Sequence, residues 1–288
     1  MAEPSMFFRA LGSKGRDGTL VFLNATGLNA SAYLPLLEQL SFDGLILAGS
    51  LRGHGATDLP ANPKELQSWE LFAEDVATEL EKRGVDGPLT LAGHSAGSVT
   101  ALLTAKRLST QQVIMIEPVV LPAFAVWLAN TPLKAWTIDQ NPLARRAAAR
   151  RSHFPSREEA AAAYRRKGFF KSWDEEAFAG YIEEGFREAG EAGGVVLSCD
   201  PAWEAACFGA QASGFWPHLD TVISRGTQVD ILGAEVASTF TTTDRQRARD
   251  KGASVLDMDG SHMLPVEEPA RVASWMSDRL STIEALGV

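Results

Sequence analysis

The chain has 288 residues, of which 45% are hydrophobic and 22% are charged, the usual balance of a globular protein. This length allows one large domain or one domain with an insert. The formal net charge of −9 argues against nucleic-acid binding, because a surface that contacts phosphates needs an excess of lysine and arginine. No apolar stretch approaches the roughly 18 residues of a membrane span, and the N-terminal residues lack the pattern of a secretory signal. We therefore expect a cytoplasmic protein that does not enter a membrane.

Apolar runs alternate with amphipathic segments in the first part of the chain. Buried strands are predicted at 19–26, 44–50, 88–92 and 111–118. Helices are predicted between them at 32–40, 68–84 and 98–108. Parallel strands need a long crossover, usually a helix, so this alternation predicts βαβ units. The expected fold class is α/β, with a mostly parallel central sheet and helices on both faces.

The alternation stops at about residue 119, and the stretch from there to 216 is largely helical and partly basic. Within it, only 194–199 has the pattern of a buried strand. Beyond it we predict strands at 227–233 and 254–260, and helices at 245–251 and 269–285. The chain is thus expected to form the first part of an α/β core (1–118), a helical cap insert (119–216) and the second part of the core (217–288).

Arginines gather in this insert, at Arg145, Arg146, Arg150, Arg151, Arg165 and Arg166. A site for an anionic substrate is one interpretation. Their spacing, however, spreads them around helices, and acidic residues follow closely enough to pair with them, at Glu158, Glu159, Asp174 and Glu175. We therefore favour a solvated, ion-paired surface.

The two cysteines, Cys199 and Cys207, lack the C-x-x-C spacing of a metal or redox site. Their separation allows a disulfide, but two free thiols in a reducing cytoplasm are the simpler interpretation. The five histidines form no compact ligand motif such as H-E-x-x-H. We expect neither a metal nor a cofactor.

A serine framed by two glycines lies between a predicted strand and a predicted helix, in LTLAGHSAGSV at 89–99. Serine is a poor nucleophile at neutral pH unless a base removes its proton. A tight strand-to-helix turn makes the hydroxyl project from the sheet, and G-x-S-x-G is the pattern of this nucleophile elbow. The N–H groups at the start of the helix can then stabilise an oxyanion. These features predict Ser95 as a nucleophile.

Of the five histidines, His262 is the best candidate for the base. It follows the last predicted strand in the loop DGSHMLPVEEP, at the carboxyl edge of the sheet where Ser95 also lies. His94 is adjacent to Ser95 on a tight turn, so we expect it to point elsewhere and pack beneath the elbow. His54 lies in a loop rich in glycine and proline and is expected to be structural or to line a pocket.

Four segments, in the order LNATGLNASAY, LRGHGATDLP, GHSAG and GSHMLPVEEP, resemble the α/β-hydrolase superfamily over nearly the whole chain. The middle stretch resembles the cap of a capped, esterase- or lactonase-like branch. The resemblance implies that Ser95 is the nucleophile, that His262 is the general base and that the Ala96 N–H is one oxyanion donor. The second donor would come from the loop after the first predicted strand. Many relatives have His-Gly-x there, whereas this chain has Asn-Ala-Thr-Gly, so Thr26 is the matching position.

The acid of the triad departs from the usual pattern. Most relatives place an aspartate three residues after the glycine that ends the strand TQVDILG, and this chain has Val236 there. Some relatives, including haloalkane dehalogenases and certain lactonases, take the acid from the end of the strand after the nucleophile, where this chain has Glu117. A carboxylate that ends an apolar run needs a partner, and His262 would provide one. We favour Glu117, with Glu235 as the alternative; a further interpretation is that Glu117 binds only neighbouring backbone or an arginine.

The expected function is that of a serine hydrolase acting on a small or medium carboxylic ester or lactone through an acyl-enzyme intermediate. A haloalkane dehalogenase is disfavoured, because its nucleophile is a carboxylate. The insert is expected to cover the pocket with apolar side chains, and the candidates are Phe124, Trp127, Trp136, Phe169, Phe170 and Trp216.

Other functions remain open on the same fold. The triad could support C–C bond hydrolysis or cofactor-free oxygen chemistry on an aromatic substrate. A hydrolase fold could also serve as a ligand receptor with vestigial turnover, although an intact triad favours catalysis. The expected partner is a small molecule, and a homodimer is one state that the chain could adopt.

Overall fold

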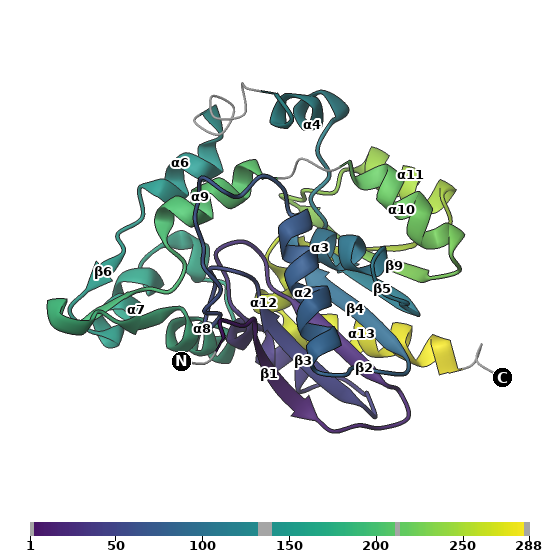
Figure 1. The fold of residues 1–288 in the computed structure, drawn as a ribbon, viewed down its shortest axis with the longest axis horizontal. Coiled ribbons are helices and arrows are strands. Elements are labelled where there is room, and N and C mark those ends of the chain that lie inside the picture. The colour runs from purple at the N-terminus through teal and green to yellow at the C-terminus, as the bar shows by residue number, and fades with distance from the viewer. Residues whose placement is uncertain (1–2, 132–139, 211–213, 285–288) are drawn as a thin grey trace.

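A seven-stranded sheet forms the centre of the fold (Figure 1) in the computed structural model, which describes residues 3–131, 140–210 and 214–284. The strands lie in the order β1-β3-β2-β4-β5-β9-β10. Their bounds are Phe7–Gly12 (β1), Thr19–Leu23 (β2), Leu45–Ser50 (β3), Leu89–His94 (β4), Gln112–Ile116 (β5), Gln228–Val236 (β9) and Ser254–Ser261 (β10). Every pairing is parallel except that of β1 with β3, so the predicted mostly parallel sheet is confirmed.

The sequence analysis does not predict β1, which runs antiparallel to β3 at the edge of the sheet. Phe8 is the one residue of this strand that is buried. The hydrophobic pattern of β1 is therefore too short to distinguish an edge strand from a terminal extension.

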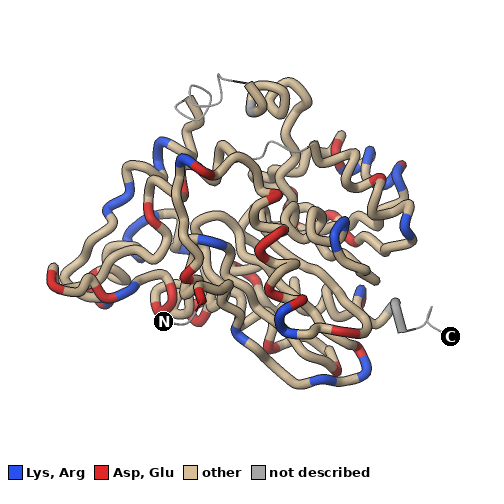
Figure 2. Tube along the Cα trace, in the orientation of Figure 1, with Lys and Arg blue, Asp and Glu red and all other residues tan. Residues whose placement is uncertain are grey.

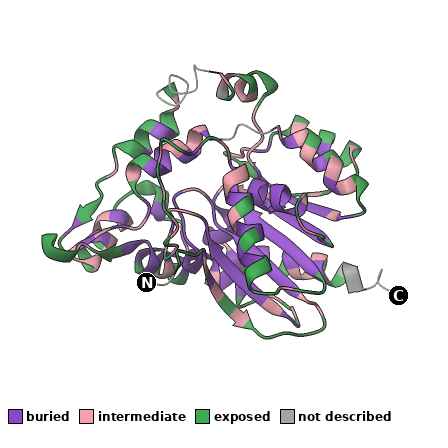
Figure 3. Ribbon diagram, in the orientation of Figure 1, coloured by how far each residue is buried: buried purple, intermediate pink, exposed green. Residues whose placement is uncertain are grey.

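Side chains of the central strands alternate between two hydrophobic cores, one on each face of the sheet. In β2, Leu20 and Phe22 enter the core that includes α1 (Leu34–Leu37), α12 (Leu264–Glu267) and α13 (Pro269–Glu284). Val21 and Leu23 enter the core that includes α2 (Glu70–Lys82), α3 (Ala96–Ala105), α10 (Phe215–Ser224) and α11 (Thr242–Asp250). Figure 3 shows the centre of the sheet buried between these layers. Burial of both faces explains why these strands are continuous apolar runs.

Polar side chains fix the starts of several helices. At α11, the Thr241 side chain accepts from the Asp244 N–H and the Asp244 carboxylate accepts from the Thr241 N–H, which forms a capping box. Asp174 caps α8 (Glu175–Glu184) and Asp200 caps α9 (Pro201–Gly209) as simple N-caps, each with its carboxylate accepting from two backbone N–H groups. No helix in the described ranges combines the length and the apolarity needed to cross a membrane.

The chain leaves the sheet after β5 and returns to it at β9. The segment between them contains α4 (Ala123–Ala129), α6 (Pro142–Ala148), α7 (Arg157–Arg165), α8 and α9, before α10 packs against α3. In Figure 1, α6, α7 and α9 lie to one side of the sheet. The strand predicted at 194–199 is β8 (Val195–Leu197), which pairs with β6 (His153–Phe154) and β7 (Phe186–Glu188) in a separate antiparallel sheet.

Cys199 and Cys207 are both free and buried. They belong to the hydrophobic core that contains α2 and α3. Burial raises the pKa of both thiols, so neither has the stabilised thiolate of a reactive cysteine.

Candidate active site

Ser95 lies on a sharp turn between β4 and α3. Its backbone angles are φ 55° and ψ −115°, a strained conformation that residues with a side chain rarely adopt. The flanking glycines permit the turn. A Cβ at Gly93 would lie 2.3 Å from the carbonyl carbon of Gly97, and a Cβ at Gly97 would lie 2.2 Å from the carbonyl oxygen of Leu23. The pentapeptide is therefore a tight strand–turn–helix with Ser95 at its tip.

His262 and Glu117 meet at the carboxyl ends of the strands. Glu117 directly follows β5, and His262 directly follows β10. The distance between His262 Nδ1 and Glu117 Oε2 is 3.0 Å. An ionised carboxylate can only accept, so Nδ1 carries the proton and Nε2 is left as the basic nitrogen of the ring.

The serine turn lies next to this pair. The Ser95 N–H donates to the carbonyl oxygen of Ile116, the residue before Glu117, over 2.9 Å. The rings of His94 and His262 are 5.0 Å apart, centroid to centroid. Within the described ranges the Ser95 hydroxyl forms no hydrogen bond, and such bonds often tighten only when substrate binds. Serine, histidine and carboxylate are thus gathered at one edge of the sheet from three different strands.

Glu117 is fully buried, and both oxygens of its carboxylate accept hydrogen bonds. Oε1 accepts from the Ala234 N–H (2.5 Å) and the Ser238 hydroxyl (2.7 Å), and Oε2 accepts from the Thr239 N–H (3.0 Å). Burial alone would raise the pKa of Glu117. The hydrogen bonds from His262, Ala234 and Ser238 outweigh burial and hold the pKa of this carboxyl below its ordinary value. Glu117 therefore stays ionised at neutral pH.

Ser238, Thr239 and Arg245 are site residues that the sequence analysis does not single out. Arg245 on α11 donates to the Ser238 hydroxyl (2.9 Å), and its Nη2 lies 4.0 Å from Glu117 Oε1. The Thr239 hydroxyl lies 3.3 Å from His262 Nδ1. A Ser-Thr pair just beyond the carboxyl end of a strand is the signal that could have drawn attention to this loop.

The alternative acid, Glu235, is exposed near the end of β9. Val236, at the position where most relatives have the acid, is 59% exposed. Among the described residues, His262 pairs with Glu117 and not with Glu235. Glu117 also accepts from the backbone N–H groups of Ala234 and Thr239 and lies near Arg245. It makes these contacts in addition to its hydrogen bond with His262.

The loop after β2, residues 24–29, carries the candidate oxyanion donor Thr26, and we name it the oxyanion loop after this candidate role. The Ala25 N–H donates to the Tyr33 hydroxyl (3.1 Å), and the Gly27 N–H donates to His54 Nε2 (3.0 Å). Between them, the Thr26 N–H has no hydrogen-bond partner in the part of the chain that the structure describes. It is the N–H of this turn that remains available to a ligand.

The other candidate donor, Ala96, is the first residue of α3, where an N–H has no partner within the helix. The start of α3 is pressed against the end of β2 and its loop. A Cβ at Gly97 would lie 2.7 Å from the carbonyl oxygen of Asn24 as well as close to Leu23. The two segments that carry Thr26 and Ala96 are therefore direct neighbours.

His54 is fully buried behind the oxyanion loop. Its Nε2 accepts from Gly27, so the proton is on Nδ1, which lies 3.0 Å from the carbonyl oxygen of Arg52. Burial, with a smaller contribution from the charge of Arg150, lowers the pKa of His54 to about 4. The protonated ring would lose its bond to Gly27, because Nε2 could no longer accept.

The free energy of unfolding is therefore expected to fall as the pH is lowered from neutrality toward 4. Since the pKa of His54 is lower in the folded state than in the unfolded state, the unfolded state takes up the proton first. His54 alone should reduce stability by about 2 kcal/mol between about pH 7 and pH 5. Urea unfolding of His54→Gln, which can keep both hydrogen bonds without titrating, should show a correspondingly flatter pH dependence. The exposed His153→Gln is the control, and equal pH dependence in all three proteins would contradict the expectation.

His94 is fully buried beneath the serine turn. Its Nε2 lies 2.8 Å from the carbonyl oxygen of His262, which can only accept, so Nδ1 must accept from the Tyr33 hydroxyl at 2.8 Å. The Tyr33 oxygen accepts in turn from Ala25. Burial lowers the pKa of His94 well below its ordinary value, so the ring is neutral. One chain of hydrogen bonds therefore connects the oxyanion loop, the serine turn and the His262 loop.

A cavity of about 360 Å³ opens beside the oxyanion loop, and Thr26 and Gly27 form part of its wall. Its aromatic lining comes from the segment between β5 and β9, at Tyr164, Phe169, Phe170, Tyr181 and Phe208. Two of the six aromatic candidates from the sequence, Phe169 and Phe170, are therefore at this cavity.

The other aromatic candidates lie elsewhere. Phe124 and Trp127 are 66% and 64% exposed on α4, and Trp216 stacks under the guanidinium of Arg247. None of these three lines the cavity. Trp136 lies outside the described residues.

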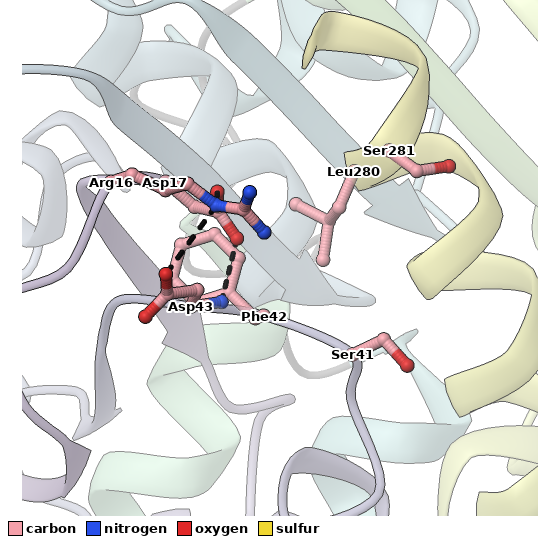
Figure 4. A pocket seen from close by; sticks show the side chains of 7 residues that line it. All are labelled: Arg16, Asp17, Ser41, Phe42, Asp43, Leu280 and Ser281. Atoms are coloured by element: carbon pink, nitrogen blue, oxygen red, sulfur yellow. Dashed lines mark hydrogen bonds and ion pairs between the residues drawn. The ribbon is translucent and has the colours of Figure 1, made fainter.

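A second cavity, of about 500 Å³, lies at the opposite edge of the sheet (Figure 4). Asp17 and Asp43 line it just before β2 and β3, at the amino ends of these parallel strands. Arg16 is 3.4 Å from the Asp43 carboxylate, and the Asp43 N–H donates to the Asp17 carboxylate (2.6 Å). This cavity is remote from the serine turn and has no part in its chemistry.

Several named hydrolases are similar to this chain. A (E)-2-((N-methylformamido)methylene)succinate hydrolase of Acinetobacter baylyi (strain ATCC 33305 / BD413 / ADP1) is 30% identical over 86 residues, 30% of this chain and 31% of that relative. The structure of an E-2-(acetamidomethylene)succinate hydrolase has a TM-score of 0.72 at 18% identity, covering 95% of this chain and 98% of that one. The enol-lactonase from Burkholderia xenovorans LB400 has a TM-score of 0.66 at 16% identity, covering 96% of each chain.

The sequence match to the Acinetobacter relative spans less than a third of its length, so it says little of the whole enzyme. The structural matches span nearly the whole chain and confirm the predicted fold, with its mostly parallel sheet flanked by helices. The model of the Alpha/beta hydrolase family matches residues 20–275, from β2 into α13. The chain therefore belongs to the alpha/beta hydrolase family.

Proposed function

We propose that this chain is a serine hydrolase that cleaves a small or medium carboxylic ester or lactone through an acyl-enzyme intermediate. The observation that carries the proposal is the hydrogen bond between buried Glu117 and His262, beside a serine on a strained turn. A carboxylate bound to Nδ1 orients the imidazole and stabilises its protonated form, which is what a serine nucleophile requires of its base.

In the proposed reaction, the Ser95 hydroxyl attacks the carbonyl carbon while His262 Nε2 takes its proton. The N–H groups of Thr26 and Ala96 stabilise the negative oxygen that develops. His262 then gives the proton to the leaving oxygen, and the bond between that oxygen and the acyl carbon breaks. A water molecule, deprotonated by the same Nε2, then bonds to the acyl carbon, the bond between that carbon and Ser95 Oγ breaks, and Nε2 returns the proton to the serine as the acid leaves. Glu117 stays ionised throughout, which its lowered pKa favours.

Membership of the family and the similarity to named hydrolases, one of them an enol-lactonase, support hydrolysis as the reaction class. We further propose that residues 119–216 act as a cap over the site. The presence of Phe169 and Phe170 in the wall of the cavity beside Thr26 supports this role.

A fluorophosphonate probe with mass mapping tests the proposal at the serine itself. The probe bonds covalently to a serine that a neighbouring base activates. We expect the label on Ser95 of the native chain and no label on the Ser95→Ala variant. Labelling of another residue, or equal labelling of the variant, would count against the proposal.

A further inference from the structure

The cavity beside the oxyanion loop carries an excess of positive charge. Arg146, Arg150 and Lys167 line it, and Glu204 is the one acidic residue in its described wall. The whole chain has a net charge of −9, so this local excess runs against the overall balance. Figure 2 shows basic positions along α6 and the turn that follows it. A concave site lined mainly by one sign of charge raises the local concentration of oppositely charged ligands.

Arg150 is held in the cavity wall by a buried network. It pairs with Glu204, and its Nη2 donates to the hydroxyls of Tyr164 (2.9 Å) and Tyr181 (2.7 Å). The expectation of a solvated arginine is wrong here, because the Arg150 side chain is only 15% exposed. Its partner is 54 residues further along the chain and is not among the nearby acids that the sequence offers. Arg165, by contrast, does pair with Glu175 as expected.

The Arg150–Glu204 pair lies directly against the oxyanion loop. A Cβ at Gly27 would lie 2.6 Å from Glu204 Oε1 and 3.5 Å from Arg150 Nη1. Gly27 follows Thr26, the candidate oxyanion donor. The candidate oxyanion donor Thr26 is thus itself part of the cavity wall, next to the charged pair.

Arg146 and Lys167 supply the charge that is not neutralised. Within the described ranges neither has a carboxylate partner, whereas Arg150 is paired with Glu204. The Lys167 ammonium lies 4.0 Å from the centre of the Tyr164 ring, so it is held over the cavity by a cation–π contact. Burial and the charge of Arg150 lower the pKa of Lys167, and they outweigh the opposing effect of the Glu204 carboxylate.

We propose that this cavity binds a carboxylate group of the substrate, so that the chain acts on esters or lactones whose acyl part carries a free carboxylate. Arg146 and Lys167 bind the carboxylate, and the aromatic wall contacts the carbon chain that joins it to the reacting carbonyl. A guanidinium matches the planar geometry of a carboxylate, which favours this anion. The inference rests on the proposed hydrolysis at Ser95 for the reaction, and it adds the substrate class.

Paired substrates test this specificity. The ratio of kcat/KM for mono-p-nitrophenyl adipate to that for p-nitrophenyl hexanoate isolates the terminal carboxylate at equal chain length. We expect the native chain to favour the adipate ester by about tenfold or more, and about 0.5 M NaCl to weaken this preference. A ratio of one or below at low salt would overturn the proposal.

Two variants assign the preference to residues. Arg146→Gln and Lys167→Gln should each lower the ratio by about tenfold. Arg145→Gln is the matched control, because Arg145 is exposed on the same helix and does not line the cavity. Ratios that fall equally in all three variants, or in none, would show that the cavity does not bind the carboxylate of the substrate. Arg150 is not used, because its removal would leave Glu204 buried without its partner.

A binding experiment separates this inference from the proposed reaction. Adipate should bind to the Ser95→Ala variant in isothermal titration, about tenfold more weakly when Arg146→Gln or Lys167→Gln is added. If Ser95 proves not to be a nucleophile but adipate binds with this dependence, the cavity is an anion site and only the reaction is wrong. If the esters are hydrolysed through Ser95 without adipate binding or preference, the reaction stands and the cavity proposal fails.

Discussion

Replacing Ser95 by alanine is expected to lower kcat for p-nitrophenyl ester hydrolysis by a factor on the order of 10⁴ or more. The variant lacks the atom that bonds to the acyl group, and water must attack the carbonyl directly. His262→Ala should cause a comparable loss, because the serine is then not deprotonated. The double variant should be little worse than either single one, since the two residues act as a unit.

Alanine is a suitable substitution at this position because it keeps the Cβ. It must adopt the same strained φ of 55°, so the turn and its glycine contacts should be retained. Thermal unfolding of Ser95→Ala checks this directly. Ser109→Ala, an exposed serine beyond the end of α3, controls for loss of a serine hydroxyl as such. Turnover by Ser95→Ala within about twofold of the native chain would rule out this serine as the nucleophile.

Local patterns explain why much of the fold and part of the candidate site could be predicted. The turn at Ser95 depends on glycines two residues away on either side, and the buried strand and helix around it are adjacent in sequence. Glu117 could be placed at the carboxyl edge because it directly ends an apolar run. His262 could be placed there because it follows the last predicted strand, 254–260. In each case the residue and the pattern that positions it lie within one short segment.

Contacts between distant segments could not be predicted. The donors to Glu117 include Ser238, which lies 121 residues further along the chain, and no pattern in a single sequence reports such a pairing. The burial of Arg150 depends on Glu204 and on two tyrosines of other helices. The spacing of the arginines along the chain therefore wrongly predicts a solvated side chain at this position. The exposure of Phe124 and Trp127 is likewise set by what α4 packs against, not by their hydrophobicity.

Replacing Glu117 by glutamine is expected to lower kcat by a factor on the order of 10³ to 10⁴. The carboxylate accepts from donors on both oxygens, the backbone N–H of Ala234 on one and that of Thr239 on the other. Either orientation of the glutamine amide therefore sets its NH₂ against a backbone N–H. One orientation also opposes His262 Nδ1–H and favours the wrong tautomer of the base. The negative charge that stabilises protonated His262 is lost in both.

Glu235→Gln is the matched control, since it makes the same chemical change on an exposed residue near the end of β9. Its kcat should stay within about twofold of the native value. A merely structural role for Glu117 would lower stability and leave the activity of the folded fraction unchanged, so kcat must be measured per folded molecule, with urea unfolding alongside. Because the pKa of Glu117 is lowered in the folded state, its contribution to stability is present above its ordinary pKa and is lost as the pH falls through the lowered value. A larger loss of kcat in Glu235→Gln than in Glu117→Gln would assign the role of the triad acid to Glu235, near the end of β9.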